Sequence, residues 1–130
     1  MILDSSAIIA ILRDEPEAAG MAEAIDRMGS CSTSAVNYVE AAIVIDSGKS
    51  SISSRRFDDF FREADIAVES VTPEQARIAR EAYRDFGKGR HRAGLNLGDC
   101  FAYALAKEKG ETLLFKGDDF CHTDIEPAIE

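Results

Sequence analysis

The sequence has no tryptophan, and its three cysteines, Cys31, Cys100 and Cys121, are odd in number and show no C-x-x-C spacing. This pattern argues against a disulfide framework and against a zinc site. Basic residues are also scarce, because 15 of them stand against 24 acidic residues and leave a formal net charge of -9. Such a balance excludes proteins that coat nucleic acid through bulk electrostatics. We expect a cytoplasmic protein whose contacts with any nucleic acid are local.

The sequence also has no segment typical of a membrane span or a secretory leader. Its apolar start, residues 1–12, has no basic leader, contains Asp4 and stops at Arg13. With 45% hydrophobic residues, 130 residues are enough for one core and short for two. We therefore expect a single domain over residues 1–130 that makes no membrane contact.

Short apolar segments alternate with helical patterns along the chain. Strands are expected at residues 1–3, 31–35, 66–71 and 112–115. Helices are expected at residues 5–13, 16–28, 37–47, 57–64, 72–87 and 97–109. The Ser-rich residues 48–56 are interpreted as a connection into a helix start. Strands that alternate with helices predict an α/β fold whose mainly parallel sheet is covered on both faces.

Residues typical of helix starts support these bounds. Ser5 or Ser6 is expected to cap the first helix, and Thr33 or Ser34 the third. Pro16 is expected to open the second helix, because proline is favoured in the first helical turn.

Acidic residues follow two of the expected strands. Asp4 comes directly after the first strand, and Asp118 and Asp119 follow Gly117 after the last. Ligand sites of parallel sheets lie beyond the carboxyl ends of the strands, so these acids are candidate site residues. The alternatives are a helix N-cap for Asp4 and ordinary turn formation for the other two.

Glu40 lies on a mostly apolar helix face. The residues three and four positions away are Val36, Asn37, Ile43 and Val44. A carboxylate in such surroundings needs protonation, a cation or a metal, since an unpaired buried charge costs several kcal/mol. A basic partner from elsewhere in the fold is the alternative.

Asp99 leads into a helix that is apolar on nearly every side and begins at Asn96 or Gly98. The alternative is an acid favoured in the first turn by the helix macrodipole. If strand ends and helix starts meet, Asp4, Glu40, Asp99 and Asp119 converge. Oxygen ligands of this kind suit Mg²⁺ or Mn²⁺, and such clusters commonly serve phosphoryl chemistry.

Four motifs carry a resemblance to a known family. They read MILDSSA, TSAVNYVE, GKGRHRAGLNLGDCFAYALA and LLFKGDDF. In their order and spacing the chain resembles VapC toxins, the PIN-domain ribonucleases of type II toxin-antitoxin pairs, from residue 1 to about residue 125. The resemblance implies a three-layer α/β/α sandwich, a Mg²⁺-dependent endoribonuclease activity, a homodimer and inhibition by a VapB-like antitoxin.

The resemblance also assigns roles to the acids. By motif, Asp4, Glu40 and Asp99 are the metal-binding acids, and Ser6 supports Asp4 or a water. Gly117 occupies a slot that is acidic in many members, so the fourth catalytic acid is Asp119, with Asp118 in reserve. The implied reaction is hydrolysis of RNA phosphodiester bonds by a water that Mg²⁺ activates.

A basic stretch, residues 87–92, lies just upstream of Asp99. Its Lys88, Arg90 and Arg92 are candidate contacts for RNA phosphates. The alternative is a solvated loop between two helices. The apolar residues 38–45 and 57–61 are core or, in part, a dimer interface, and an open acidic groove suits a basic antitoxin tail. Two other functions stay open: a catalytically inactive PIN-like binding module and a phosphoacceptor signalling domain.

Overall fold

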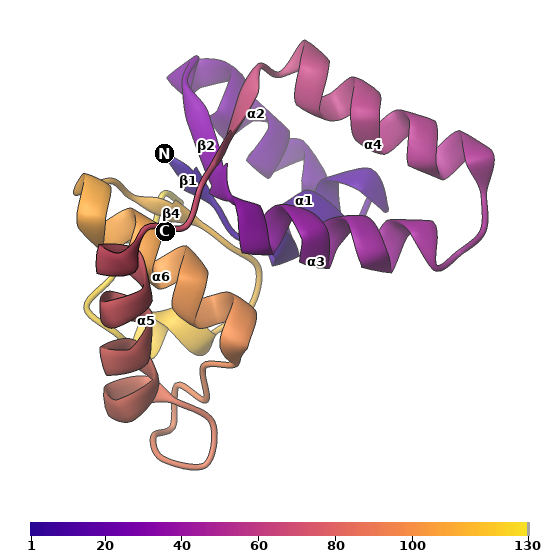
Figure 1. Ribbon diagram of the computed structural model, residues 1–130. Helices are drawn as coiled ribbons and strands as arrows, with labels where there is room; N and C mark the ends of the chain where they lie inside the picture. Colours follow the sequence, from indigo (N-terminus) through magenta and orange to yellow (C-terminus); the bar gives the residue numbers. More distant parts are fainter. Residues whose placement is uncertain (130) are drawn as a thin grey trace.

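The computed structural model describes residues 1–129. It contains a four-stranded parallel sheet in the order β3-β2-β1-β4, shown with its helices in Figure 1. The strands are β1 (Ile2–Leu3), β2 (Cys31–Ser34), β3 (Ile66–Glu69) and β4 (Leu113–Leu114). The α-helices are α1 (Ser5–Leu12), α2 (Ala18–Met28), α3 (Ala35–Asp46), α4 (Ser51–Glu63), α5 (Pro73–Phe86) and α6 (Leu97–Lys109), and a short 3-10 helix, η1, spans Asp119–His122.

Two cores lie on opposite faces of the sheet. Successive strand side chains point to opposite faces, so Leu3 joins the apolar cluster of α1, α2, α3 and α4. Ile2 joins the cluster formed with α5 and α6. Leu114 and Leu113 divide between the same two clusters. This arrangement confirms the predicted three-layer α/β/α sandwich with a parallel sheet.

Two predicted helix starts are wrong, and local chemistry explains both. α2 begins at Ala18 rather than at Pro16, because Asp14 adopts a positive φ of 52° and places Pro16 in a turn after α1. α4 begins at Ser51, six residues before the predicted start at residue 57. Ser50 caps it, since its hydroxyl accepts a 3.2 Å hydrogen bond from the Ser53 backbone N–H.

The other differences at element ends are small. α3 begins directly after β2, at Ala35, because the Ser34 hydroxyl accepts from the Val36 N–H at 3.2 Å and caps the helix. Each strand is one or two residues shorter than predicted, a difference that is common at the ends of helices and strands.

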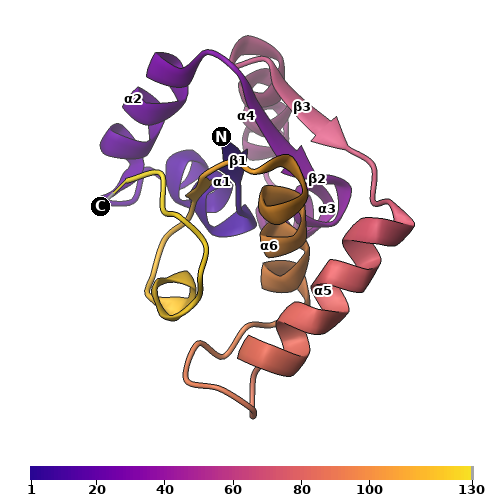
Figure 2. The same cartoon turned by 90° about the vertical axis from the view of Figure 1, so that its left-hand side faces the viewer.

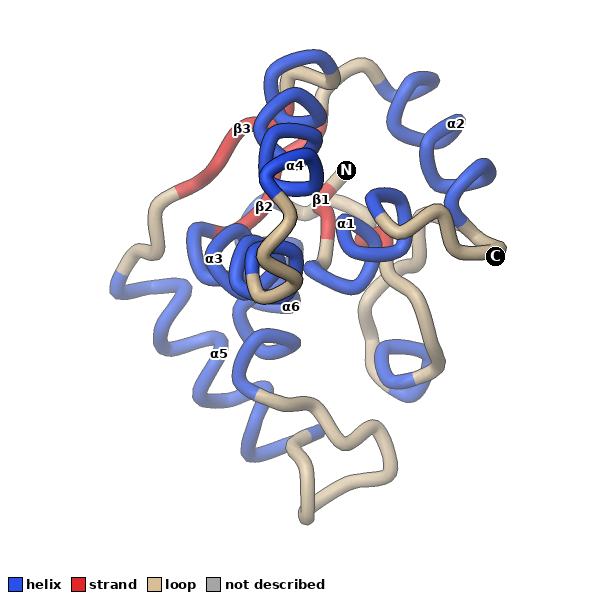
Figure 3. The backbone as a smooth tube through the Cα atoms, turned by 90° about the vertical axis from the view of Figure 1, so that its right-hand side faces the viewer, coloured by secondary structure: helices blue, strands red, loops and turns tan. Residues whose placement is uncertain are grey.

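Two helices begin at the carboxyl end of the parallel sheet. α1 begins after β1 and α3 begins after β2, at the carboxyl ends of two paired parallel strands. α3 packs against both α1 and α6. α6 lies between α5 and the C-terminal segment that carries η1 (Figure 2), and Figure 3 shows the same elements from the opposite side. None of the helices within residues 1–129 is long and apolar enough to cross a membrane.

Candidate active site

Asp4 is the N-cap of α1, which confirms the alternative considered for it and corrects the expected cap at Ser5 or Ser6. Its Oδ2 atom accepts hydrogen bonds from the Ser6 N–H at 3.0 Å and from the Ser6 hydroxyl at 2.6 Å. Its Oδ1 atom is buried and has no hydrogen-bond partner. Burial raises the pKa of Asp4, although the bonds from Ser6 act in the opposite direction. The cap therefore uses only half of a carboxylate that is 2% exposed.

Ser6 connects Asp4 to the end of the neighbouring strand. Its hydroxyl oxygen accepts a 3.0 Å hydrogen bond from the Lys116 N–H, two residues beyond β4. The Asp4 backbone N–H donates to the Leu114 carbonyl at 2.9 Å. These bonds fix the Asp4 carboxylate relative to both strand ends, which fits the supporting role predicted for Ser6.

Glu40 projects from α3 toward the starts of α1 and α6. Its Oε1 accepts a hydrogen bond from the Ser5 hydroxyl. A Cβ atom placed on Gly98 would lie within 2.7 Å of three atoms of the Glu40 carboxyl group, so the carboxylate rests directly on the first turn of α6. Within residues 1–129 no lysine or arginine forms an ion pair with Glu40, which removes the basic partner considered above.

Asp99 lies at the third position of α6 and forms a capping box with Asn96. Asp99 N–H donates to the Asn96 side chain at 2.9 Å, and Asp99 Oδ2 accepts from the Asn96 N–H at 3.0 Å. The pKa of Asp99 is raised to about 7. Burial is the main cause and the negative charges of Asp4, Asp119 and Glu40 add to it, whereas the backbone hydrogen bond from Asn96 acts in the opposite direction.

The same electrostatic effects show which acids the fold brings together. Asp4, Glu40 and Asp119 each lie close enough to affect the pKa of Asp99, and Glu40 also raises that of Asp4. Asp119 is exposed at the start of η1, and its neighbour Asp118 is exposed as well. The four predicted acids thus lie in one region of the fold, and their catalytic and metal-binding roles stay predictions.

The donor set of this cluster fits a hard divalent cation. The four carboxylates influence one another electrostatically, and across residues 1–129 none of them forms an ion pair with a cationic side chain. The free Oδ1 of Asp4 is an oxygen ligand without a competing partner. In the described part of the chain no three acidic, histidine or cysteine side chains already have a metal-holding arrangement. Three of the carboxylates instead accept protein hydrogen bonds, from Ser6, Ser5 and the backbone of Asn96.

Two residues that join the acids were not among the predicted site residues. Ser5 donates to Glu40, and Asn37 Nδ2 donates to the Gly98 carbonyl at 3.0 Å. Both side chains are buried, with Asn37 0% exposed. The sequence contained one signal for Asn37, a polar residue one turn before Glu40 on the same mostly apolar face.

The basic stretch forms an exposed loop between α5 and α6. Lys88, Arg90 and Arg92 are all exposed, and none forms an ion pair within residues 1–129. Arg90 lies 5.7 Å from the centre of the Tyr83 ring, and the Tyr83 hydroxyl donates to the Lys88 carbonyl at 3.2 Å. The loop is therefore held at its base while its charges remain free.

Comparison with known proteins gives consistent matches over nearly the whole chain. The model of the PIN domain family matches residues 1–126. Ribonuclease VapC28 of Mycobacterium tuberculosis is 51% identical over 131 residues, which cover 100% of this chain and 98% of that protein. Ribonuclease VapC of Mycolicibacterium smegmatis is 48% identical over 125 residues, which cover 96% and 97% of the two chains.

Two solved structures share the fold at low sequence identity. Mycobacterium tuberculosis VapC20, a Sarcin-Ricin loop cleaving toxin, matches with a TM-score of 0.73 and 16% identity, covering 95% of both chains. A toxin-antitoxin complex from Klebsiella pneumoniae matches with a TM-score of 0.70 and 14% identity, covering 95% of this chain and 92% of that one.

Proposed function

Because this chain belongs to the PIN domain family and its relatives are VapC ribonucleases, we propose that it is a VapC-type toxin that cleaves RNA as a metal-dependent endoribonuclease. One observation carries the proposal. Four acids from separate parts of the chain converge, two of them with raised pKa values, and no cationic side chain within residues 1–129 pairs with any of them. Acids with raised pKa values in such a cluster are typical of functional sites.

The residues proposed to hold Mg²⁺, or Mn²⁺ in its place, are Asp4 and Asp99, with Glu40 bound directly or through water. When bound, the ion supplies Lewis acidity toward the phosphate and a more acidic water. Ser6 holds one Asp4 oxygen and leaves the other free, and Ser5 orients Glu40. Asp119 adds negative charge at the open side of the cluster, where we propose that it assists as the fourth catalytic acid.

A polyanion must approach this negative site, and the loop after α5 supplies cations for that approach. We propose that Lys88, Arg90 and Arg92 contact RNA phosphates on the way to Asp99, eleven or fewer residues further along the chain. Within residues 1–129 none of the three pairs with an acidic side chain, so their full charge is available. Phosphate contacts of this kind position the substrate and carry no sequence information.

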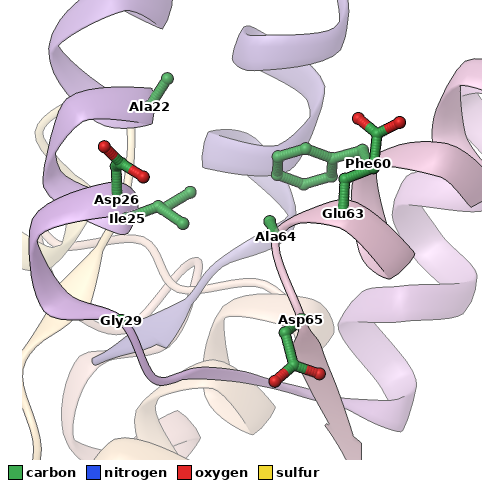
Figure 4. Close-up of a pocket in the computed structure, with 8 residues that line it drawn as sticks. All are labelled: Ala22, Ile25, Asp26, Gly29, Phe60, Glu63, Ala64 and Asp65. Carbon is green, nitrogen blue, oxygen red and sulfur yellow. The ribbon is translucent and has the colours of Figure 1, made fainter.

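A VapB-like antitoxin is the proposed protein partner. A groove of about 460 Å³ lies between α2 and the end of α4, and Figure 4 shows the residues that line it. Ile25 and Phe60 supply apolar surface in it, and Asp26, Glu63 and Asp65 add negative charge. An apolar groove with acidic edges suits an amphipathic basic segment, and a basic side chain that reaches the four acids would compete with the metal.

A homodimer is also proposed, and one apolar surface supports it. Val39, Ile43 and Leu97 are 52%, 62% and 71% exposed, and they line a shallow depression of about 580 Å³ across α3 and the start of α6. The other apolar stripe has a different role, because Phe57 and Phe61 pack with Tyr38 as part of the core. Exposed apolar patches of this kind mark association sites.

The experiment that tests the function is cleavage of a total-RNA pool by the purified, antitoxin-free protein, with Mg²⁺ and with EDTA. Asp99→Asn protein, purified in the same way, controls for contaminating nucleases. We expect discrete products that require Mg²⁺ and are absent with the variant. Equal RNA cleavage by the two proteins would overturn the proposed enzyme activity and favour the catalytically inactive binding module.

A further inference from the structure

Asn37 is fully buried between the two helices that carry Glu40 and Asp99. It lies in the first turn of α3, which begins at the carboxyl end of β2. Its Nδ2 donates a 3.0 Å hydrogen bond to the backbone carbonyl of Gly98, the residue next to Asp99. A carbonyl can only accept, so this bond defines the orientation of the amide.

α3 contacts Gly98 at a second point, through Glu40. Asn37 and Glu40 are three residues apart and therefore share one face of α3. Asn37 holds the Gly98 carbonyl, and the Glu40 carboxyl group occupies the space where a Cβ atom of residue 98 would lie. Glycine thus allows α3 and α6 to approach closely, and the Asn37 bond fixes the distance between them.

Stability alone does not account for a buried asparagine at position 37. Its Oδ1 atom is buried without a hydrogen-bond partner, and such an orphan acceptor lowers the free energy of unfolding. Of the three buried side-chain atoms without a partner in residues 1–129, two belong to this region, Asp4 Oδ1 and Asn37 Oδ1. The third is Gln75 Oε1, on α5. A leucine at position 37 would fill similar space without the orphan acceptor.

We propose that Asn37 is a positioning residue of the metal site: through its hydrogen bond to Gly98 it fixes the spacing between Glu40 on α3 and Asp99 on α6. The proposal rests on the proposed function. It explains why a buried amide with one unsatisfied atom lies between two acids. Replacement of a residue that orients metal ligands without binding the metal commonly changes metal affinity or activity by about 10- to 100-fold.

The test measures Mn²⁺ binding by electron paramagnetic resonance and thermal unfolding for the full-length wild type and for Asn37→Leu. We expect the variant to keep or exceed the wild-type Tm in the absence of metal and to bind Mn²⁺ about 10-fold or more weakly. Gln75→Leu is the matched control, because it removes a buried amide that also has one orphan oxygen and whose Nε2 donates to Glu108 at 2.8 Å. It should leave Mn²⁺ affinity unchanged.

Gly98→Ala disturbs the same contact from α6, because its methyl group would collide with the Glu40 carboxylate. We expect it to weaken Mn²⁺ binding as well. The double variant with Asn37→Leu should bind Mn²⁺ no more weakly than the single variant of lower affinity, since both substitutions act on one contact. Wild-type Mn²⁺ affinity in either folded variant would overturn the proposal. The proposal would also be overturned if Asn37→Leu lost Mn²⁺ affinity only because it unfolds, while Gly98→Ala bound Mn²⁺ normally. A wild type that neither binds Mn²⁺ nor cleaves RNA would instead overturn the proposed function.

Discussion

Two aspartates, one within α6 and one bound to it, have pKa values shifted in opposite directions. Asp124 accepts a hydrogen bond from the Tyr103 hydroxyl at 2.7 Å and an ion-paired one from Lys107 at 2.8 Å. Partial burial tends to raise its pKa, but the bonds from Lys107 and Tyr103 outweigh it and the pKa is lowered. Within residues 1–129 Asp99 pairs with no cationic side chain, three acids lie near it, and its pKa is raised to about 7. One carboxylate at α6 thus has a countercharge, and the other does not.

The difference separates a structural acid from a functional one. Asp124 attaches the C-terminal segment to α6 and carries its own counterion within the chain. Asp99 costs folding free energy in the metal-free protein, since burial and like charges disfavour its ionised form. Proteins accept such a cost where a ligand relieves it.

Catalysis should separate the two aspartates most strongly. We expect Asp99→Asn to lower the rate of Mg²⁺-dependent RNA cleavage by about 10³-fold, because it removes a metal ligand worth several kcal/mol of charge stabilisation. Asp124→Asn should stay within about threefold of wild type, since Asp124 is paired and lies outside the acid cluster. Initial rates at saturating Mg²⁺ provide the measurement. Similar losses in both variants would remove the distinction between the two sites.

Stability should change in opposite directions at the two sites. Asp99 has a higher pKa in the folded state than its ordinary value of 3.8, so the folded state binds more protons and Asp99 makes the protein less stable as the pH rises from about 4 to about 7. In metal-free protein at pH 7, Asp99→Asn should raise the free energy of unfolding by about 1–3 kcal/mol. An asparagine oxygen can still accept from the Asn96 N–H, so the cap survives.

For Asp124 the sign is reversed, because its folded-state pKa is lowered. Its contribution is present above the ordinary pKa of an aspartate and is lost as the pH falls through the folded-state value. Asp124→Asn should lower stability at pH 7 by less than about 1 kcal/mol, because the side chain is 52% exposed. Urea unfolding in EDTA at pH 4.5 and pH 7 measures both effects. A stability loss at pH 7 in Asp99→Asn would contradict the account.

The two adjacent acids at the start of η1 allow a finer comparison. Asp119 is among the main groups that raise the pKa of Asp99, and Asp118 is not. Asp119→Asn should therefore slow RNA cleavage by about 10-fold, and Asp118→Asn should stay within about threefold. Cleavage rates of the two variants, with the fold checked by circular dichroism, decide the matter. The reverse order would move the fourth catalytic role to Asp118.

The smallest effect is expected from the basic loop. Replacing Lys88, Arg90 and Arg92 by glutamine should weaken RNA binding and reduce the slope of log affinity against log salt by about 2, near 0.7 per lost phosphate contact. Binding is best measured in the Asp99→Asn background, where cleavage does not interfere.

A control with the same change in net charge comes from α2 and α4. Arg27, Arg55 and Arg62 lie on these helices, on the face of the sheet away from α5 and α6. Their replacement by glutamine should leave the salt slope unchanged. A reduced slope for this control would mean that only the net charge matters.

Much of this architecture was predictable from local sequence patterns. The alternation of apolar segments and helices predicted a parallel sheet with two covered faces, and the structure confirms it. Asp4 could be selected because it directly follows a strand of a parallel sheet, and Glu40 because it carries charge on a mostly apolar helix face. A single domain over residues 1–130 stays a prediction, as do the catalytic and metal-binding roles of the acids.

The rest depended on contacts that local patterns do not specify. Asp4, Ser5 and Ser6 are all good capping residues, so sequence alone could not identify Asp4 as the cap. Asn37 reaches across 61 residues of sequence to Gly98, and no periodicity reports such a contact. The acids inside α3 and at the start of α6 also separate this cluster from a phosphoacceptor site, whose acids follow strands alone.

If the four acids form a site for a divalent cation, the bound ion can be located directly. A crystal structure of the wild-type protein grown with Mn²⁺ tests for this site most directly, because the anomalous signal of manganese locates the ion without assumptions about its ligands. We predict a peak bound by oxygens of Asp4 and Asp99, with Glu40 either in contact or one water away. No peak at the acid cluster, or a peak held only by other residues, would contradict the account.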